Sequence, residues 1–300
     1  MSTSSRHPGT PGYATVRVCE VVRLSPSLIR VVFDGVDPSI LTSSGVPDEI
    51  VHLSFPADGE DAPPEMTVVN GILGHHGQDA GRDCRNYTVR RWDADRVFVD
   101  FVDHGAGVAS SWARSARPGQ LLGMWGTRSW YEPPADTEWM LLVADLAGLP
   151  ALMRVVEQLP AGQRAHAIVE VRHAEDMLPV ESAAEVTVDW RIGGNGHAPS
   201  MLADAVATYE LPSAADRGYV WFAGEASAGR AVRKQLRGVM PPSRLAIIGY
   251  WRDDKEAWLD RYEHASDRLL AEYEQVTASA DMSEAEAELH WDEILERAGL

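Results

Sequence analysis

The sequence has little cysteine, little lysine and no long apolar run. Its two cysteines, Cys19 and Cys84, lie too far apart in the chain to form a C-x-x-C pair. Zinc sites and cysteine-bound iron–sulfur clusters usually need such pairs, so we predict no metal site. No apolar stretch approaches the roughly 18 residues of a membrane span. Residues 1–12 lack an apolar core, so we expect a tail in place of a signal peptide, and a cytoplasmic protein.

Negative charge is in clear excess. The chain holds 45 Asp and Glu against 27 Lys and Arg, a formal net charge of -18, and its only lysines are Lys234 and Lys255. Nucleic-acid binding requires clustered positive charge, so we expect no nucleic-acid partner, and we expect no membrane partner either. A hydrophobic fraction of 45% and a length of 300 residues suit a globular protein of two domains, whose oligomeric state these features leave open.

The first half of the chain predicts short strands. Residues 14–24 alternate between two faces, and Pro118-Gly119 is one of the turns that separate the later strands. Such spacing is typical of a small antiparallel β-barrel. Residues 56–81 are rich in Pro, Gly and acidic residues, so we expect a solvated loop in which His75 and His76 bind no metal. Further strands are predicted at 29–33, 50–55, 97–102 and 121–124.

The second half alternates between strands and helices. This order predicts a parallel sheet with helices on both faces, and nicotinamide dinucleotides bind at the carboxyl ends of such strands. Beyond Trp251 we expect charged helices at 256–275 and 283–298, the latter opened by a Ser283–Glu286 capping box. Strands are predicted at 140–144, 165–171, 186–190, 219–223 and 245–250, and helices at 149–158, 200–209 and 228–236.

The predicted fold therefore has two domains and an extension. An N-terminal antiparallel β-barrel is expected at residues 13–132. An α/β domain with a parallel sheet, of the nicotinamide-binding type, is expected at residues 137–252. A C-terminal helical extension is expected at residues 253–300.

One strand of the barrel carries a set of residues that suits a flavin. In the stretch Arg85–Arg90, Tyr87 and Val89 point one way while Thr88 and Arg90 point the other. An aromatic ring can lie on the isoalloxazine, a hydroxyl can meet its N5 edge, and an arginine can bind the pyrophosphate. The same pair of Tyr87 and Thr88 also suits an ordinary strand.

A glycine-containing turn follows the next strand. His104 and Gly107 lie in this turn, and we expect a helix to start near Ser110. A helix N-terminus that is reached through glycine suits a phosphate group. His104 by itself would more often be a hydrogen-bonded structural residue. The phosphate turn predicted here consists of His104, Gly107, Ala109, Ser110 and Ser111.

These motifs together resemble a known family. Arg85–Arg90 reads R-x-Y-T-V-R, and D-F-V-x-H-G, G-x-A-S-x-W-A and P-G follow in that order. The sequence resembles the siderophore-interacting proteins, FAD-dependent ferric-siderophore reductases of the ferredoxin-reductase-like superfamily. The similarity covers roughly residues 14–255. It continues in Leu141–Asp145, Ile168–Val171, Trp221–Ala226 and Gly249–Arg252.

The resemblance implies FAD as cofactor, NADPH or NADH as electron donor and a ferric siderophore as small-molecule substrate. It requires no covalent protein chemistry, so no catalytic residue is assigned. The predicted cofactor-binding residues are Arg85, Tyr87, Thr88, Val89, Arg90, His104, Gly107, Ala109, Ser110, Ser111, Trp130, Asp145 and Glu225.

Two departures from the family pattern motivate alternatives. The usual G-P-x-G turn is Gly126 to Ser129 here, and Trp130 follows it. The usual G-D-E-T-A-L-P-A segment keeps Asp145 but has Leu146 and Ala147 in place of two polar residues. We therefore expect weaker hydride transfer. The main alternative is an FAD-binding scaffold with a weakened nicotinamide site, recruited as a tailoring or non-redox enzyme. A binding protein without flavin is the third reading.

The loop after the predicted strand at 186–190 also allows two interpretations. Arg191 stands where the family has a basic residue, and Gly193, Gly194 and Gly196 follow it around Asn195. Such a loop suits a phosphate group, and it suits a surface turn equally well.

Overall fold

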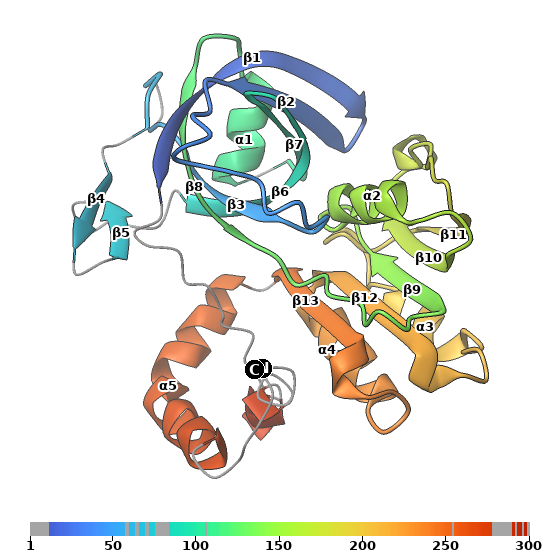
Figure 1. The fold of residues 1–300 in the computed structure, drawn as a ribbon. Coiled ribbons are helices and arrows are strands. Elements are labelled where there is room, and N and C mark those ends of the chain that lie inside the picture. The colour runs from blue at the N-terminus through green and yellow to red at the C-terminus, as the bar shows by residue number, and fades with distance from the viewer. Residues whose placement is uncertain are drawn as a thin grey trace. The chain divides into compact units, whose positions relative to one another are not determined.

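The computed structural model describes residues 12–57, 60–63, 66–69, 72–75, 84–105, 107–253, 255–277, 290–291, 293–295 and 297–298. The chain forms two compact units (Figure 1). Unit 1 comprises Met1–Tyr131, Leu149–Leu159 and Arg172–Ala183, and unit 2 comprises Glu132–Gly148, Pro160–Val171 and Ala184–Leu300.

Unit 1 contains a closed antiparallel barrel. Its strand order is β1-β2-β7-β6-β3-β8, and every neighbouring pair is antiparallel. The prediction of an N-terminal barrel is confirmed. Helix α1 (Val108–Ser115) begins at Val108, slightly earlier than expected. The barrel strands are β1 (Tyr13–Ser25), β2 (Leu28–Asp34), β3 (Ile50–Ser54), β6 (Cys84–Asp93), β7 (Arg96–Val102) and β8 (Leu121–Arg128).

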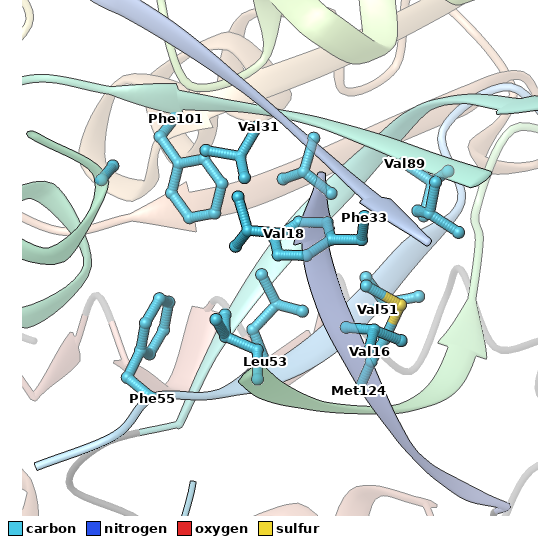
Figure 2. Close-up of a cluster of buried hydrophobic side chains, with 14 of the residues drawn as sticks. Val16, Val18, Val31, Phe33, Val51, Leu53, Phe55, Val89, Phe101 and Met124 are labelled. Atoms are coloured by element: carbon cyan, nitrogen blue, oxygen red, sulfur yellow. The ribbon is translucent and has the colours of Figure 1, made fainter. Parts of the chain in front are cut away.

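Alternate residues of these strands fill the barrel. Val16, Phe33, Leu53, Val89 and Phe101 come from five different strands, and each is completely buried. Figure 2 shows their side chains gathered in one cluster. Burial of a side chain of this size contributes roughly 1.5–3 kcal/mol, so the cluster fixes the register of the strands.

The predicted loop at 56–81 is wrong in part. Two short strands, β4 (Met66–Val69) and β5 (Ile72–His75), pair antiparallel within it. Each strand has four residues, so the surrounding Pro, Gly and acidic residues dominate the composition of the segment and conceal its β-branched positions. His76 lies outside the described residues.

Unit 2 contains a parallel sheet of order β11-β10-β9-β12-β13. The prediction of a parallel sheet is confirmed. Ala144 of β9 pairs with Val169 of β10 and Ala223 of β12, so these strands end at one edge. The strands are β9 (Trp139–Ala144), β10 (Arg164–Val171), β11 (Glu185–Ile192), β12 (Gly218–Glu225) and β13 (Leu245–Trp251).

Helices follow the strands of this sheet along the chain. Helix α3 (Leu202–Thr208) and helix α4 (Ala226–Leu236) pack against Leu141, Val143 and Phe222 of the sheet. Helix α2 (Leu149–Gln158), which follows β9, is part of unit 1 and packs on β6. The described residues also form short 3-10 helices, namely η1 (Ala174–Asp176), η2 (Ala215–Arg217) and η3 (Pro242–Arg244).

The chain continues into the helical extension. Helix α5 (Lys255–Thr277) buries Leu269 against Ile294 and Leu295. The expected capping residues of the second helix, Ser283 and Glu286, lie outside the described residues. Within the described part of the chain, every helix is too short or too polar to cross a membrane.

Candidate functional site

Strand β6 presents the aromatic ring of Tyr87 at the margin of the barrel core. The ring is half-buried, and its centroid lies 4.4 Å from that of Phe101. Burial raises the pKa of Tyr87 well above its usual value, against the opposing effect of the Arg85 guanidinium. The phenol is therefore neutral near pH 7, and Tyr87 as a whole residue is only partly buried.

The next residue, Thr88, has a buried hydroxyl with no hydrogen-bond partner. It lies opposite Ile50 in the β3–β6 ladder and is 5% exposed, and its Oγ1 makes no hydrogen bond within the described part of the chain. An unsatisfied buried hydroxyl destabilises a fold by roughly 1–3 kcal/mol. A flavin edge that offers a polar atom would satisfy it. The residues of β6 thus fit FAD, and the predicted contact of Thr88 with the N5 edge stays a prediction.

The two arginines of the motif already have partners in the chain. Arg85 donates from Nη1 to the Cys84 carbonyl oxygen at 2.7 Å. Arg90 forms a two-point ion pair with Glu157 of helix α2, in which Nη1 lies 2.7 Å from Oε2. Sequence reasoning did not find Glu157. The predicted phosphate contacts of both arginines stay predictions.

The predicted phosphate turn forms the start of α1. Gly107 has φ 88°, and a Cβ on it would lie 3.2 Å from Cε1 of His104, so glycine suits this position for two reasons. Among the described residues, no side chain caps the N-terminus of α1. Ala109 and Ser110 are buried and Ser111 is exposed. Backbone N–H groups at such a terminus suit a phosphate.

Three arginines converge beside this turn. Arg23 and Arg114 pair with the carboxylate of Asp103 at 3.0 and 2.9 Å, and Arg172 donates to the Asp103 carbonyl oxygen at 3.0 Å. Burial opposes ionisation of Asp103, but the hydrogen bonds from Arg23 and Arg114 outweigh it and hold its pKa below the usual value. Desolvation, and then the charge of Arg172, lower the pKa of His104. Positive charge exceeds negative charge here, which fits a diphosphate.

The sequence did not single out these three arginines. They come from β1, from α1 and from the segment after β10. Residues so distant in the chain give no local motif, and the excess of arginine over lysine was the only signal.

Trp130 lies at the end of the predicted flavin turn. Its backbone N–H is 3.1 Å from both carboxylate oxygens of the buried Asp48. The guanidinium of Arg128 lies 4.8 Å from the centre of its ring. The two contacts fix Trp130, whose predicted role in cofactor binding stays a prediction.

Asp145 of unit 2 is saturated by donors of the chain. Its Oδ1 accepts from the backbone of Ala147 at 2.8 Å, and its Oδ2 accepts from the backbone of Glu225 at 2.9 Å and from Nε1 of Trp251 at 2.6 Å. Burial nevertheless raises the pKa of Asp145 to about 6. Asp145 thus joins the ends of β9, β12 and β13, and its role toward a cofactor stays a prediction.

Glu225 caps the helix that follows β12. Its carboxylate accepts from the backbone N–H of Ser227 at 2.6 Å and of Ala228 at 3.0 Å. Such capping satisfies donors at the start of α4. Glu225 and Asp145 are in direct contact through the Glu225 backbone N–H, while the other predicted cofactor residues belong to unit 1.

The glycine-rich loop after β11 is anchored by Asn195. Its Oδ1 accepts from the Leu146 backbone N–H at 2.9 Å, and its Nδ2 donates to the carbonyl oxygens of Glu170 and Gly193 at 3.2 and 3.0 Å. Arg191 pairs with Asp189 instead. The loop is therefore joined to the Asp145–Gly148 turn, the segment in which two polar residues of the family pattern are absent.

Two family profiles match the chain. "Siderophore-interacting FAD-binding domain" matches residues 17–130, and "Siderophore-interacting protein" matches residues 137–254. Together the two matches span more than half of the chain.

Relatives and solved structures agree with these matches. The ferric vibriobactin reductase ViuB of Vibrio cholerae is 29% identical over 57% of this chain, and the alignment spans 65% of that protein's length. The NADPH-dependent ferric-chelate reductase of Escherichia coli is 28% identical over 80% of this chain and 92% of its own. The structure of a siderophore utilization protein from T. fusca is 31% identical, with a TM-score of 0.69, over 82% of this chain and 94% of that one.

The barrel that carries the flavin motif and the parallel sheet that follows it are each matched by a profile of one family, and a solved structure of similar sequence spans both. This chain belongs to the siderophore-interacting protein family.

Proposed function

We propose that this protein is a cytoplasmic, flavin-dependent reductase that passes electrons from NADPH or NADH through FAD to a ferric siderophore. The observation that carries the proposal is the buried Thr88 hydroxyl, which has no hydrogen-bond partner among the described residues and lies within the segment that matches the FAD-binding domain profile. When bound, FAD would accept two electrons together from one nicotinamide and release them singly, so that two Fe(III) become Fe(II) and one proton is set free.

The residues of unit 1 would hold the flavin. Tyr87 offers a neutral ring, and Thr88, the next residue of β6, offers a buried hydroxyl. The first turn of α1 offers backbone N–H groups to the diphosphate, and Arg114 and Arg172 add positive charge next to them. We include in the proposal that the same turn binds the phosphate groups through His104, Gly107 and Ser110.

The edge of the sheet in unit 2 would hold the nicotinamide nucleotide. Dinucleotides bind at the carboxyl ends of parallel strands, where Asp145, Asn195 and Glu225 organise the loops. Leu146 is completely buried, and its side chain has no polar atom. It therefore cannot make the contact that a polar residue of the family could make with the nucleotide. We infer that nicotinamide binds here more weakly than in a chain that keeps both polar residues.

The substrate proposed is an anionic iron chelate. Fe(II) binds hard oxygen ligands more weakly than Fe(III) does, so reduction releases the metal. The formal net charge of -18 repels such a chelate, and a local positive group has to offset it. Arg252, whose guanidinium lies 4.3 Å from the centre of the Trp258 ring, is one such group.

The domain boundaries proposed from the sequence assign flavin binding and nucleotide binding to separate domains. Residues 13–132 would form the flavin-binding domain, residues 137–252 the nucleotide-binding domain and residues 253–300 the helical extension. The two profile matches and the separate barrel and sheet support this division, while residues 149–159 and 172–183 belong to the same compact unit as the barrel.

A stopped-flow experiment tests the reductase. The FAD-loaded protein is mixed anaerobically with NADPH or NADH, and the flavin absorbance should bleach. Subsequent mixing with a panel of ferric chelates should restore the absorbance and yield two Fe(II), trapped by a ferrous indicator, for each nicotinamide consumed. A protein that takes up no FAD, or a flavin that does not bleach at high nucleotide concentration, would end the proposal.

A further inference from the structure

Helix α2 holds the strand that carries the flavin motif. Arg154 of α2 donates from Nη1 to the Val89 carbonyl oxygen at 2.8 Å, and Glu157, one helical turn further on, pairs with Arg90. All four residues belong to unit 1. Helix α2 therefore contacts two consecutive residues of β6, Val89 and Arg90, through side chains one helical turn apart.

Arg154 also forms a buried ion pair. The side chains of Arg154 and Glu49 are 7% and 0% exposed, and Nη1 of Arg154 lies 3.4 Å from Oε2 of Glu49. Trp92 and Ser43 donate to the same Oε2 at 2.8 and 2.7 Å. Replacing a buried ion pair by apolar residues of similar volume is often neutral or stabilising. The charges of this pair are therefore weak evidence for a role in stability alone.

The part of β6 that is held is an irregularity next to Thr88. The pairing of β6 with β7 shifts register between Val89 and Arg91, while the Val89 N–H donates to the Glu49 carbonyl oxygen at 2.9 Å. Bulges of this kind redirect neighbouring side chains and are frequent beside active sites. Arg154 satisfies the Val89 carbonyl oxygen here and so fixes the backbone that follows Thr88.

We propose that Arg154 is a positioning residue: together with Glu49 and the Arg90–Glu157 pair, it sets the direction of the Thr88 hydroxyl toward the flavin. We call these four residues, Glu49, Arg90, Arg154 and Glu157, the α2 clasp. The proposal rests on the proposed function, because it takes Thr88 to be a flavin contact.

The variant Glu49→Gln/Arg154→Met tests the α2 clasp, because it removes both buried charges together. Apoprotein is titrated with FAD by fluorescence, and the visible spectrum and midpoint potential of the bound flavin are measured. The visible spectrum and the midpoint potential should shift in the same direction as they do in Thr88→Val. Flavin reduction should slow by about tenfold to hundredfold, the effect expected of a small misplacement. The variant that combines all three substitutions should be no slower than Thr88→Val, since the clasp acts through that hydroxyl.

Two further variants keep the test decisive. Glu157→Gln changes a carboxylate that is 36% exposed, so it threatens folding little, and it should shift the potential in the same direction by less. Asp34→Asn is the matched control, because Asp34 forms a two-point pair with Arg17 on the same barrel at 2.9 and 3.1 Å. It should leave the spectrum, the potential and the reduction rate unchanged.

The outcomes distinguish a failure of the positioning proposal from a failure of the proposed reductase function. An unchanged spectrum and potential in both clasp variants would overturn the proposal. The proposal would also be overturned if the clasp substitutions and Thr88→Val slowed flavin reduction by independent factors. A loss of FAD affinity that merely accompanies a fall in melting temperature would overturn it as well. If the wild-type flavin is not reduced by NADPH or NADH, the proposed function fails, while the spectra and potentials still test the clasp.

Discussion

Trp251 donates its indole N–H to Oδ2 of Asp145 across 2.6 Å, which ties the last residue of β13 to the residue that follows β9. The same oxygen accepts from the backbone of Glu225 at the end of β12. One carboxylate thus holds together the strand ends at which a nucleotide would bind. Because this carboxylate is buried, its protonation is linked to the stability of the edge.

The first prediction concerns pH and Asp145. Burial raises the folded-state pKa of Asp145 from 3.8 to about 6, so the folded state binds this proton more tightly than the unfolded state does. Its stabilising contribution is complete below pH 3.8 and is lost as the pH rises through 6. In urea unfolding, the free energy of unfolding of wild type minus that of Asp145→Asn should fall over this range, by at most about 1.4 kcal/mol per pH unit.

A difference that instead grows with pH over the same range would contradict this prediction. It would mean that the donors from Trp251, Ala147 and Glu225 outweigh burial and that the pKa of Asp145 is lowered. Trp251→Phe is the control, because it removes the side-chain donor and keeps an aromatic ring. It should raise the pKa further and move the fall in stability to higher pH.

The second prediction concerns the apoprotein of Thr88→Val. Valine has nearly the same shape as threonine, and it removes a buried hydroxyl that has no partner in the described structure. The apoprotein should therefore be as stable as wild type, or more stable by about 1 kcal/mol. FAD binding should weaken at the same time. Urea unfolding and FAD titration measure the two effects, and an apoprotein that is clearly less stable would show that the hydroxyl has a partner in the fold.

Periodicity was sufficient to predict both halves of the fold. Alternation along 14–24 and the short strands after it led to the barrel, because each strand buries one face, such as that of Val16 and Val18 in β1. The buried run at 140–144 and the helices that follow led to the parallel sheet. Strands β4 and β5 were missed, because four residues are too few for a pattern to outweigh the composition around them.

The residues of the flavin motif were predicted from local spacing, and their partners were not. Periodicity indicates that a residue is buried, but it does not name its neighbour. Arg154 and Val89 are 65 positions apart, and only the closed fold brings them together. A charged residue within the apolar run of α2 was the one sequence signal that Arg154 gave.

The third prediction concerns Gly107. An alanine there would have to adopt φ 88°, and its Cβ would lie 3.2 Å from the His104 ring. Gly107→Ala should weaken FAD binding at least tenfold, because the ring or the turn has to move by a fraction of an ångström. Gly119→Ala is the matched control, since Gly119 has φ 97° and open space around its Cβ position. Equal FAD affinities of the two variants would contradict a phosphate role for the turn.

The fourth prediction concerns Asn195, which has φ 56° and joins the glycine-rich loop to Leu146. Asn195→Ala removes its hydrogen bonds, leaves the buried Leu146 N–H without its acceptor and strains the backbone. The free energy of unfolding should fall by about 1–3 kcal/mol for the lost hydrogen bonds. Asn195→Gly loses the same hydrogen bonds without the strain, so it should be more stable than the alanine variant by about 1 kcal/mol.

These two variants also test where the nicotinamide nucleotide binds. Asn195 belongs to unit 2, and the proposed flavin residues of β6 and α1 belong to unit 1. Asn195→Gly should therefore raise the nucleotide concentration at which flavin bleaching is half-maximal, while the FAD dissociation constant stays at the wild-type value. Because the bleaching rate at saturation depends on the flavin surroundings, it should change little. Unchanged nucleotide dependence in a folded Asn195→Gly protein would remove this loop from the nucleotide site, and the search for that site would move to the other loops at the carboxyl edge of the sheet.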